Sequence, residues 1–160
     1  MQQIKVHAEG SAETVHVLGN LITFLVTGAQ TQQRFSMVEA LTAPGAGSPP
    51  HLHRDDEEAF YVLEGTYAFT IDGKTVLRGP GSVVHVARGT PHAFANAGEA
   101  PARMLILNWP ADHHERFFRA LGEPVAPGTT GFPAPKAPDL AAVAAAAQAS
   151  GIELLPPQPQ

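Results

Sequence analysis

Histidine and acidic residues cluster in one short stretch of the sequence, where their types and spacing could bind a metal ion. His51 and His53 are two positions apart, so in an extended strand both imidazoles would point to the same side. Glu58 follows a turn that contains Asp55 and Asp56, and we expect this turn to be solvated. Two imidazoles and a carboxylate on adjacent strands form the beginning of a chelating group.

A third imidazole comes from a later part of the chain. His92 follows a Gly-Thr-Pro turn signal and can reach the same interior. Together with His51, His53 and Glu58 it would form a site of three neutral imidazoles and one carboxylate. Such a set leaves positions on an octahedral ion free for a substrate, which favours catalysis over a purely structural role.

The chain contains no cysteine, which excludes disulfides, thiolate zinc sites and iron–sulfur clusters. Any metal must therefore be bound by His, Asp or Glu. Of the remaining candidates, His85 is expected to face solvent or a dimer contact. His113 and His114 open an amphipathic helix and are expected on the surface.

The charge balance argues against polyanionic partners. Ten basic and 15 acidic residues give a net charge of -5, without a Lys/Arg cluster, so we expect neither nucleic acid nor a membrane surface as a partner. Residues 1–10 lack the pattern of a signal peptide, and the longest apolar run, residues 140–147, is far shorter than the roughly 20 residues of a membrane span. These features predict a cytoplasmic protein.

Short strands must position these side chains. Between residues 15 and 107, β-branched and aromatic runs alternate with Gly, Pro, Asn and Asp, which is typical of an antiparallel sandwich or barrel. The length of 160 residues suits one such domain. Asp72-Gly73 predicts a tight hairpin turn. The predicted strands are residues 21–26, 35–41, 58–63, 66–71, 74–77, 82–86, 93–95 and 102–107.

The C-terminal part has a different pattern. Asp112 is expected to cap a helix that packs on the outside of the barrel. Residues 123–138 read as a Pro-rich linker, and Asp139 as the cap of an Ala-rich helix that ends near residue 150. We divide the chain into a β-barrel domain with its flanking helix, residues 1–122, and a tail, residues 123–160. The apolar end of the tail predicts that it docks on its own barrel or on a partner's.

The ligand candidates stand in two spaced motifs. The first reads Gly45, five residues, His51, one residue, His53, four residues, Glu58, six residues, Gly65. The second reads Gly81, five residues, Ala87, one residue, Gly89, two residues, His92, three residues, Asn96. Both resemble the paired motifs of the cupin superfamily, with Ala87 where the family has proline. Only Glu58 keeps both spacings of the first motif, although Glu57 would be the ligand if the turn were one residue shorter.

The resemblance implies an all-β fold, a cupin jelly-roll β-barrel with a C-terminal helical extension. It also implies one divalent transition metal bound by His51, His53, Glu58 and His92. The expected ion is Fe, Mn, Ni or Co, and Zn or Cu would also suit the ligands. Many cupins form dimers, so a homodimer is expected. Beyond the motif positions, the sequence of residues 49–65 is similar to that of small single-domain cupins related to quercetin dioxygenases.

On this resemblance we expect a dioxygenase that oxidises an enolic or phenolic aromatic, flavonol-like small molecule. Glu58 is the expected catalytic residue because its carboxylate could take the substrate's proton. A carboxylate bound to a cation is a weak base, so Glu58 would have to loosen its coordination when substrate arrives. Two alternatives stay open: an O₂-independent metal-dependent isomerase, cyclase or decarboxylase, and a non-catalytic small-molecule-binding cupin.

Overall fold

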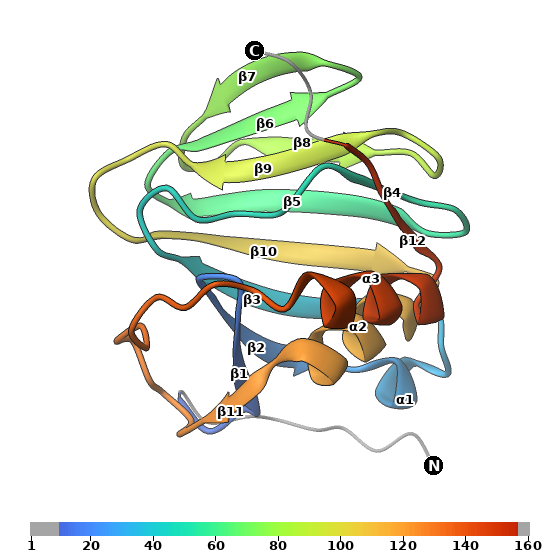
Figure 1. The fold of residues 1–160 in the computed structure, drawn as a ribbon, viewed down its shortest axis with the longest axis horizontal. Helices are drawn as coiled ribbons and strands as arrows, with labels where there is room; N and C mark the ends of the chain where they lie inside the picture. The colour runs from blue at the N-terminus through green and yellow to red at the C-terminus, as the bar shows by residue number, and fades with distance from the viewer. Residues whose placement is uncertain (1–9, 157–160) are drawn as a thin grey trace.

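Two antiparallel sheets form most of the computed structural model, which describes residues 10–156 (Figure 1). The expectation about residues 1–10 therefore falls almost entirely outside the described part of the chain. The larger sheet has seven strands in the order β11-β1-β2-β3-β10-β5-β8. In chain order these strands are β1 (Thr14–Val17), β2 (Asn20–Val26), β3 (Ser36–Thr42), β5 (Glu57–Glu64), β8 (Val83–Val86), β10 (Ala102–Trp109) and β11 (Glu123–Val125).

The smaller sheet has five strands in the order β12-β4-β9-β6-β7. Its strands are β4 (His51–His53), β6 (Tyr67–Ile71), β7 (Lys74–Arg78), β9 (His92–Asn96) and β12 (Ile152–Leu154). The predicted turn between β6 and β7 is confirmed, since Asp72 and Gly73 have φ values of 47° and 76°. All eight predicted strands are present, with ends that differ by one or two residues.

Alternating side chains place the core between the two sheets. In β3 and β10 every second residue is buried, as expected for strands with one face on the core. Phe60 and Met104 of the larger sheet and Phe69 of the smaller sheet belong to the same buried cluster. The all-β jelly-roll fold is thus confirmed. The two sheets do not close into a continuous barrel, because β8 and β7 end their sheets without a further strand partner in residues 10–156.

Three helices accompany the sheets: α1 (Gly28–Thr31), α2 (His113–Leu121) and α3 (Leu140–Ala149). Asp139 caps α3 as predicted, because its Oδ1 accepts hydrogen bonds from the backbone N–H groups of Ala141 and Ala142. Asp112 stands at the N-cap position of α2 as predicted, but its side chain does not cap the helix. Its φ is 91°, it makes no side-chain cap hydrogen bond, and its carboxylate instead pairs with Arg116. Within residues 10–156 no helix has the length and apolar character needed to cross a membrane.

The C-terminal segment lies against its own chain. α2 and α3 pack side by side next to the larger sheet, and the chain then runs back across the molecule to β12 (Figure 1). β12 pairs with β4, the strand that carries the two nearby histidines. The expected linker also begins with a strand, β11, which pairs with β1. Sequence reasoning missed β11 because it is three residues long and contains Pro124, which is tolerated at a sheet edge.

Candidate metal centre

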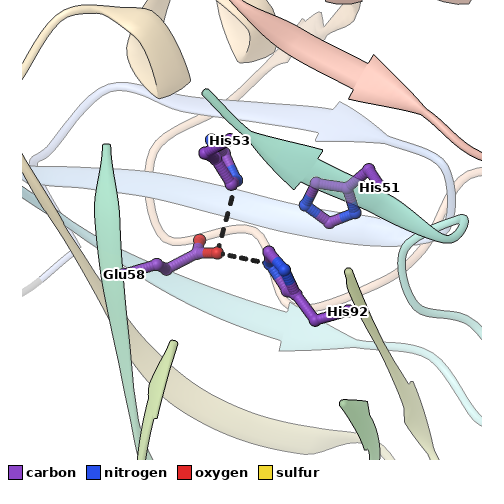
Figure 2. A group of neighbouring side chains, drawn as sticks. All are labelled: His51, His53, Glu58 and His92. Atoms are coloured by element: carbon purple, nitrogen blue, oxygen red, sulfur yellow. Dashed lines mark hydrogen bonds and ion pairs between the residues drawn. The ribbon is translucent and has the colours of Figure 1, made fainter. Parts of the chain in front are cut away.

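Three strands carry the four predicted ligands. His51 and His53 of β4 are 6% and 2% exposed, whereas Leu52 between them is half-buried. Glu58 lies on β5, and His92 begins β9 directly opposite His51. Figure 2 shows the four side chains pointing toward one another inside the fold. The structure therefore brings all four predicted residues together.

The donor atoms form a compact group within 4.8 Å of one another. His92 Nε2 lies 2.8 Å from Glu58 Oε2, and His53 Nε2 lies 3.4 Å from the same oxygen. The ring centres of His51 and His92 are 4.3 Å apart. A single ion can therefore be shared by all four side chains.

Glu58, and not Glu57, faces this group. The register of β5 buries Glu58 and Phe60 on the inner face and turns Glu57 outward. On the outer face Glu57 Oε2 lies 2.9 Å from His85 Nε2. His85 is exposed, as expected, and stacks on Trp109 with ring centres 5.8 Å apart.

The ring nitrogens leave lone pairs free for an ion. The Nδ1 atoms of His51 and His92 lie 2.8 and 2.9 Å from the backbone carbonyls of Pro49 and Thr90. These carbonyls can only accept, so each Nδ1 carries a proton. An ion would bind at each Nε2, and at His92 it would replace the contact of Nε2 with Glu58 Oε2. Neither nitrogen of the buried His53 has a hydrogen-bond partner among the residues described. The site thus fits a divalent transition metal that accepts nitrogen and oxygen ligands.

Burial and mutual charge set the protonation of these groups. Burial, together with the neighbouring His92, lowers the pKa of His51 to about 3. Burial also opposes a charged His53, but the adjacent Glu58 outweighs it and raises the pKa of His53 to about 9. Although burial favours the acid form of Glu58, the nearby imidazoles hold the pKa of this carboxyl well below its usual value. Without an ion, His53 and Glu58 therefore form a buried charged pair at neutral pH.

Helix α2 adds an imidazole that we expected on the surface. His114 is 8% exposed, and its Nδ1 lies 2.5 Å from Asn108 Oδ1 and 3.5 Å from Glu58 Oε1. Burial lowers the pKa of His114 to about 4, so it is neutral at pH 7. A signal was present in the sequence, because His114, Phe117, Phe118 and Leu121 follow the i, i+3, i+4, i+7 spacing of a buried helix face.

Asp56 is also buried, at 2% exposure, although a solvated turn was expected. The side chain turns inward because imidazoles are available there: His113 Nδ1 lies 2.6 Å from Asp56 Oδ1. Burial raises the pKa of a carboxyl, but His53 and His113 outweigh it and lower the pKa of Asp56. Its neighbour Asp55 is exposed, in agreement with the prediction.

A small cavity adjoins the metal centre. It has a volume of about 40 Å³, and His51, Glu58 and His114 provide polar groups in its wall. Much of the remaining wall is apolar. It is formed by side chains of β9, α2 and β12, including Phe94, Phe117, Phe118, Ile152 and Leu154. A cavity of this size holds water or another very small molecule, since pockets for drug-sized ligands measure roughly 300–1,000 Å³.

Comparison with known proteins places these residues in a recognised domain. Residues 38–108, which contain all four ligands, match the family model described as "Cupin domain". An uncharacterized protein of Methanocaldococcus jannaschii is 31% identical over 80 residues, which are 50% of this chain and 64% of that protein. Quercetin 2,3-dioxygenase of Bacillus subtilis is 32% identical over 72 residues, which are 45% of this chain and 21% of the enzyme.

Two further similar proteins carry names that refer to polyketides. The tetracenomycin polyketide synthase protein TcmJ of Streptomyces glaucescens is 30% identical over 64 residues, 40% of this chain and 43% of that protein. The structure of the polyketide cyclase RemF from Streptomyces resistomycificus is similar in fold, with a TM-score of 0.60 and 24% identity over 81% of this chain and 88% of that one. The chain spans less than two thirds of the length of each of the three curated relatives.

Proposed function

Because this chain is a small member of the cupin superfamily, we propose that it is a metal-dependent dioxygenase that acts on an enolic or phenolic aromatic, flavonol-like molecule. The observation that supports this proposal is the buried group of three histidines and one glutamate beside an apolar cavity. The 32% identity to a quercetin 2,3-dioxygenase over 72 residues points in the same direction.

His51, His53, Glu58 and His92 would hold the ion. A bound divalent transition metal supplies a Lewis acid for a substrate hydroxyl and, where redox-active, a site for O₂ chemistry. The Nδ1 contacts of His51 and His92 to backbone carbonyls keep both rings in the orientation that this binding needs. The apolar side chains in the cavity wall would favour an aromatic substrate.

Glu58 would take the proton of the substrate hydroxyl. Its Oε2 lies against His92 and His53, whereas its Oε1 lies on the side of His114. The carboxylate therefore has one oxygen among the ligands and one beside a neutral imidazole. Proton uptake at Oε1 requires that Glu58 binds the ion more weakly. This oxygen lies next to His114 Nδ1.

Substrate entry would require movement of the C-terminal wall. A flavonol does not fit a cavity of about 40 Å³, so Phe117, Phe118, Ile152 and Leu154 must shift to admit it. These side chains belong to α2 and β12, which lie at the outside of the fold. The proposal therefore couples turnover of a large substrate to displacement of this segment.

Turnover with and without O₂ tests the reaction. Protein loaded separately with Fe, Mn, Ni or Co is incubated with a panel of flavonols, while O₂ uptake and product formation are recorded. We expect O₂ consumption that depends on the ion and is lost in a His51→Ala, His53→Ala double variant. The proposal fails if none of the loaded forms consumes O₂ with any enolic substrate.

A second candidate is O₂-independent chemistry on a small or polyketide-like molecule: isomerisation, cyclisation or decarboxylation. The small cavity favours a compact substrate, and the 30% identity over 64 residues to the polyketide synthase protein TcmJ supports a polyketide-like one. Equal product formation under argon and in air would favour this candidate. Release of an unmodified small molecule from the purified protein would instead favour a non-catalytic binding role.

We also propose a homodimer. Tyr61 and Val83 are opposite each other on β5 and β8 and are 40% and 65% exposed on the outer face of the larger sheet. Such an exposed apolar pair supports contact with a second copy of the chain. Light scattering of the wild type and of a Val83→Lys variant tests this assignment, with a smaller particle expected for the variant.

A further inference from the structure

We propose that Asp56 is the residue that positions His53 for metal binding, and that His113 of α2 anchors Asp56. The proposal depends on metal binding at the four ligands, but not on the reaction carried out there. Neither residue belongs to the ligand group, and His113 lies beyond residues 38–108, which match the domain family.

One nitrogen of His53 and one oxygen of Asp56 face each other without a hydrogen bond. His53 Nδ1 and Asp56 Oδ2 are 3.8 Å apart, and their side chains are both 2% exposed. Neither atom has a hydrogen-bond partner in the described part of the chain. A buried polar atom without a partner destabilises the fold, so a closer contact between these two atoms removes two such penalties at once.

The other two histidines show what His53 lacks. His51 and His92 each have a backbone carbonyl within 2.9 Å of Nδ1, which fixes the ring and leaves Nε2 for the ion. His53 has no such carbonyl, and Asp56 is the acceptor that lies next to its Nδ1. A movement of about 1 Å brings the two atoms to hydrogen-bond distance. Asp56 then does for His53 what Pro49 and Thr90 do for the other rings.

His113 holds the carboxylate in the required orientation. Its Nδ1 lies 2.6 Å from Asp56 Oδ1, so the remaining oxygen, Oδ2, is directed toward His53. A carboxylate that accepts from imidazoles on both sides is held more firmly than one with a single partner. Because His113 is the first residue of α2, this contact also ties α2, through Asp56, to the ligand His53.

Metal affinity and ligand spectroscopy test the proposal without reference to turnover. The variants are Asp56→Ala, Asp56→Asn and His113→Ala, and the matched control is Asp55→Asn, which removes the same charge from the exposed neighbouring position. Zn²⁺ affinity is measured by competition with a chromophoric chelator, and the visible spectrum of the Co²⁺-loaded protein reports the geometry around the ion. Circular dichroism of the metal-free variants checks that each is folded.

We expect Asp56→Ala to bind Zn²⁺ about 10- to 100-fold more weakly and to change the Co²⁺ spectrum. His113→Ala should lose less affinity, and Asp55→Asn should behave as wild type. Asp56→Asn should restore part of the affinity and the spectrum, because its amide oxygen still accepts from Nδ1. Unchanged affinity and spectrum in Asp56→Ala would overturn the proposal, while a wild type that binds no ion would overturn the metal site itself.

A second measurement covers the case in which Asp56→Ala does not fold. Nitrogen NMR of the Zn²⁺-loaded protein should show His53 protonated at Nδ1, with a slowly exchanging proton. This signal should shift in Asp56→Asn and stay in place in Asp55→Asn. If the NMR signal of the His53 Nδ1 proton is the same in Asp56→Asn as in wild type, the positioning role is contradicted.

Discussion

Leu154 lies directly opposite His51 in the antiparallel pairing of β12 with β4. In the same pairing Ile152 is opposite His53, so each ligand of β4 has an apolar residue of the C-terminal strand as its neighbour. β4 meets β9 on its other side at a single register position, His51 with His92. The last strand is therefore the main backbone partner that holds the first two ligands in place.

Substitution in this last strand should lower stability. Ile152→Ala removes a side chain that is 6% exposed and should cost about 2–5 kcal/mol of unfolding free energy. Leu140→Ala is the matched control, because Leu140 is 74% exposed and its loss should cost under about 0.5 kcal/mol. Urea unfolding measures both. Equal midpoints for the two variants would contradict the packing of β12 on the site.

Glu58→Gln should separate metal binding from proton transfer. The amide keeps the size of the side chain and an oxygen for the ion but cannot take a proton, so turnover should fall about 10²- to 10⁴-fold while part of the metal is retained. Glu57→Gln changes the same charge on the outer face and should leave turnover intact. Metal analysis and steady-state rates measure the two effects. Unchanged turnover in Glu58→Gln would show that this residue is not the base.

Metal affinity should rise with pH. The pKa of His53 is raised to about 9 in the absence of an ion, and an ion binds only the neutral imidazole. Below pH 9 each ion must displace one proton, so the apparent affinity should increase about tenfold per pH unit from about pH 7 and level off above about pH 9. His51, whose pKa is lowered to about 3, is already neutral and releases none. Competition titrations at several pH values test this slope, and a flat profile would contradict it.

Removal of the ion should lower the melting temperature. A ligand that binds only the folded chain stabilises it by about 2.7 kcal/mol when its free concentration is a hundredfold above Kd. Thermal unfolding with added Zn²⁺ and with a chelator should therefore differ in wild type. The His51→Ala, His53→Ala double variant should show the same transition in both conditions. A similar chelator effect in that variant would place the ion elsewhere.

The site could be predicted from the sequence because strand alternation and motif spacing agree. Two histidines two residues apart share a face in any strand, whereas Glu58 and His92 were assigned from their positions in the two cupin-like motifs. The register of β5 confirms Glu58 over Glu57. Runs of β-branched and aromatic residues located the strands around the core. His85 was expected to face outward, and it lies on the outward face of β8.

The groups around the ligands could not be predicted because they depend on how distant segments pack. Asp56 reads as a turn residue, and only the approach of α2 supplies the imidazole that draws it inward. The spacing of its helix face indicates that His114 is buried, but its contacts with Asn108 and Glu58 depend on where α2 packs. Local sequence predicts whether such a residue lies in a turn or a helix, whereas tertiary contacts decide which groups surround its side chain.

Because the ligands are divided between two sheets, the full metal site forms only when both sheets have folded together. His51, His53 and His92 come from the smaller sheet and Glu58 from the larger one, and Glu58 and His92 are 34 positions apart in the chain. An ion that meets the newly made polypeptide finds little more than two neighbouring imidazoles. The complete donor set exists only after the sheets have come together, so an ion that needs all four donors would bind the folded protein and not the nascent chain.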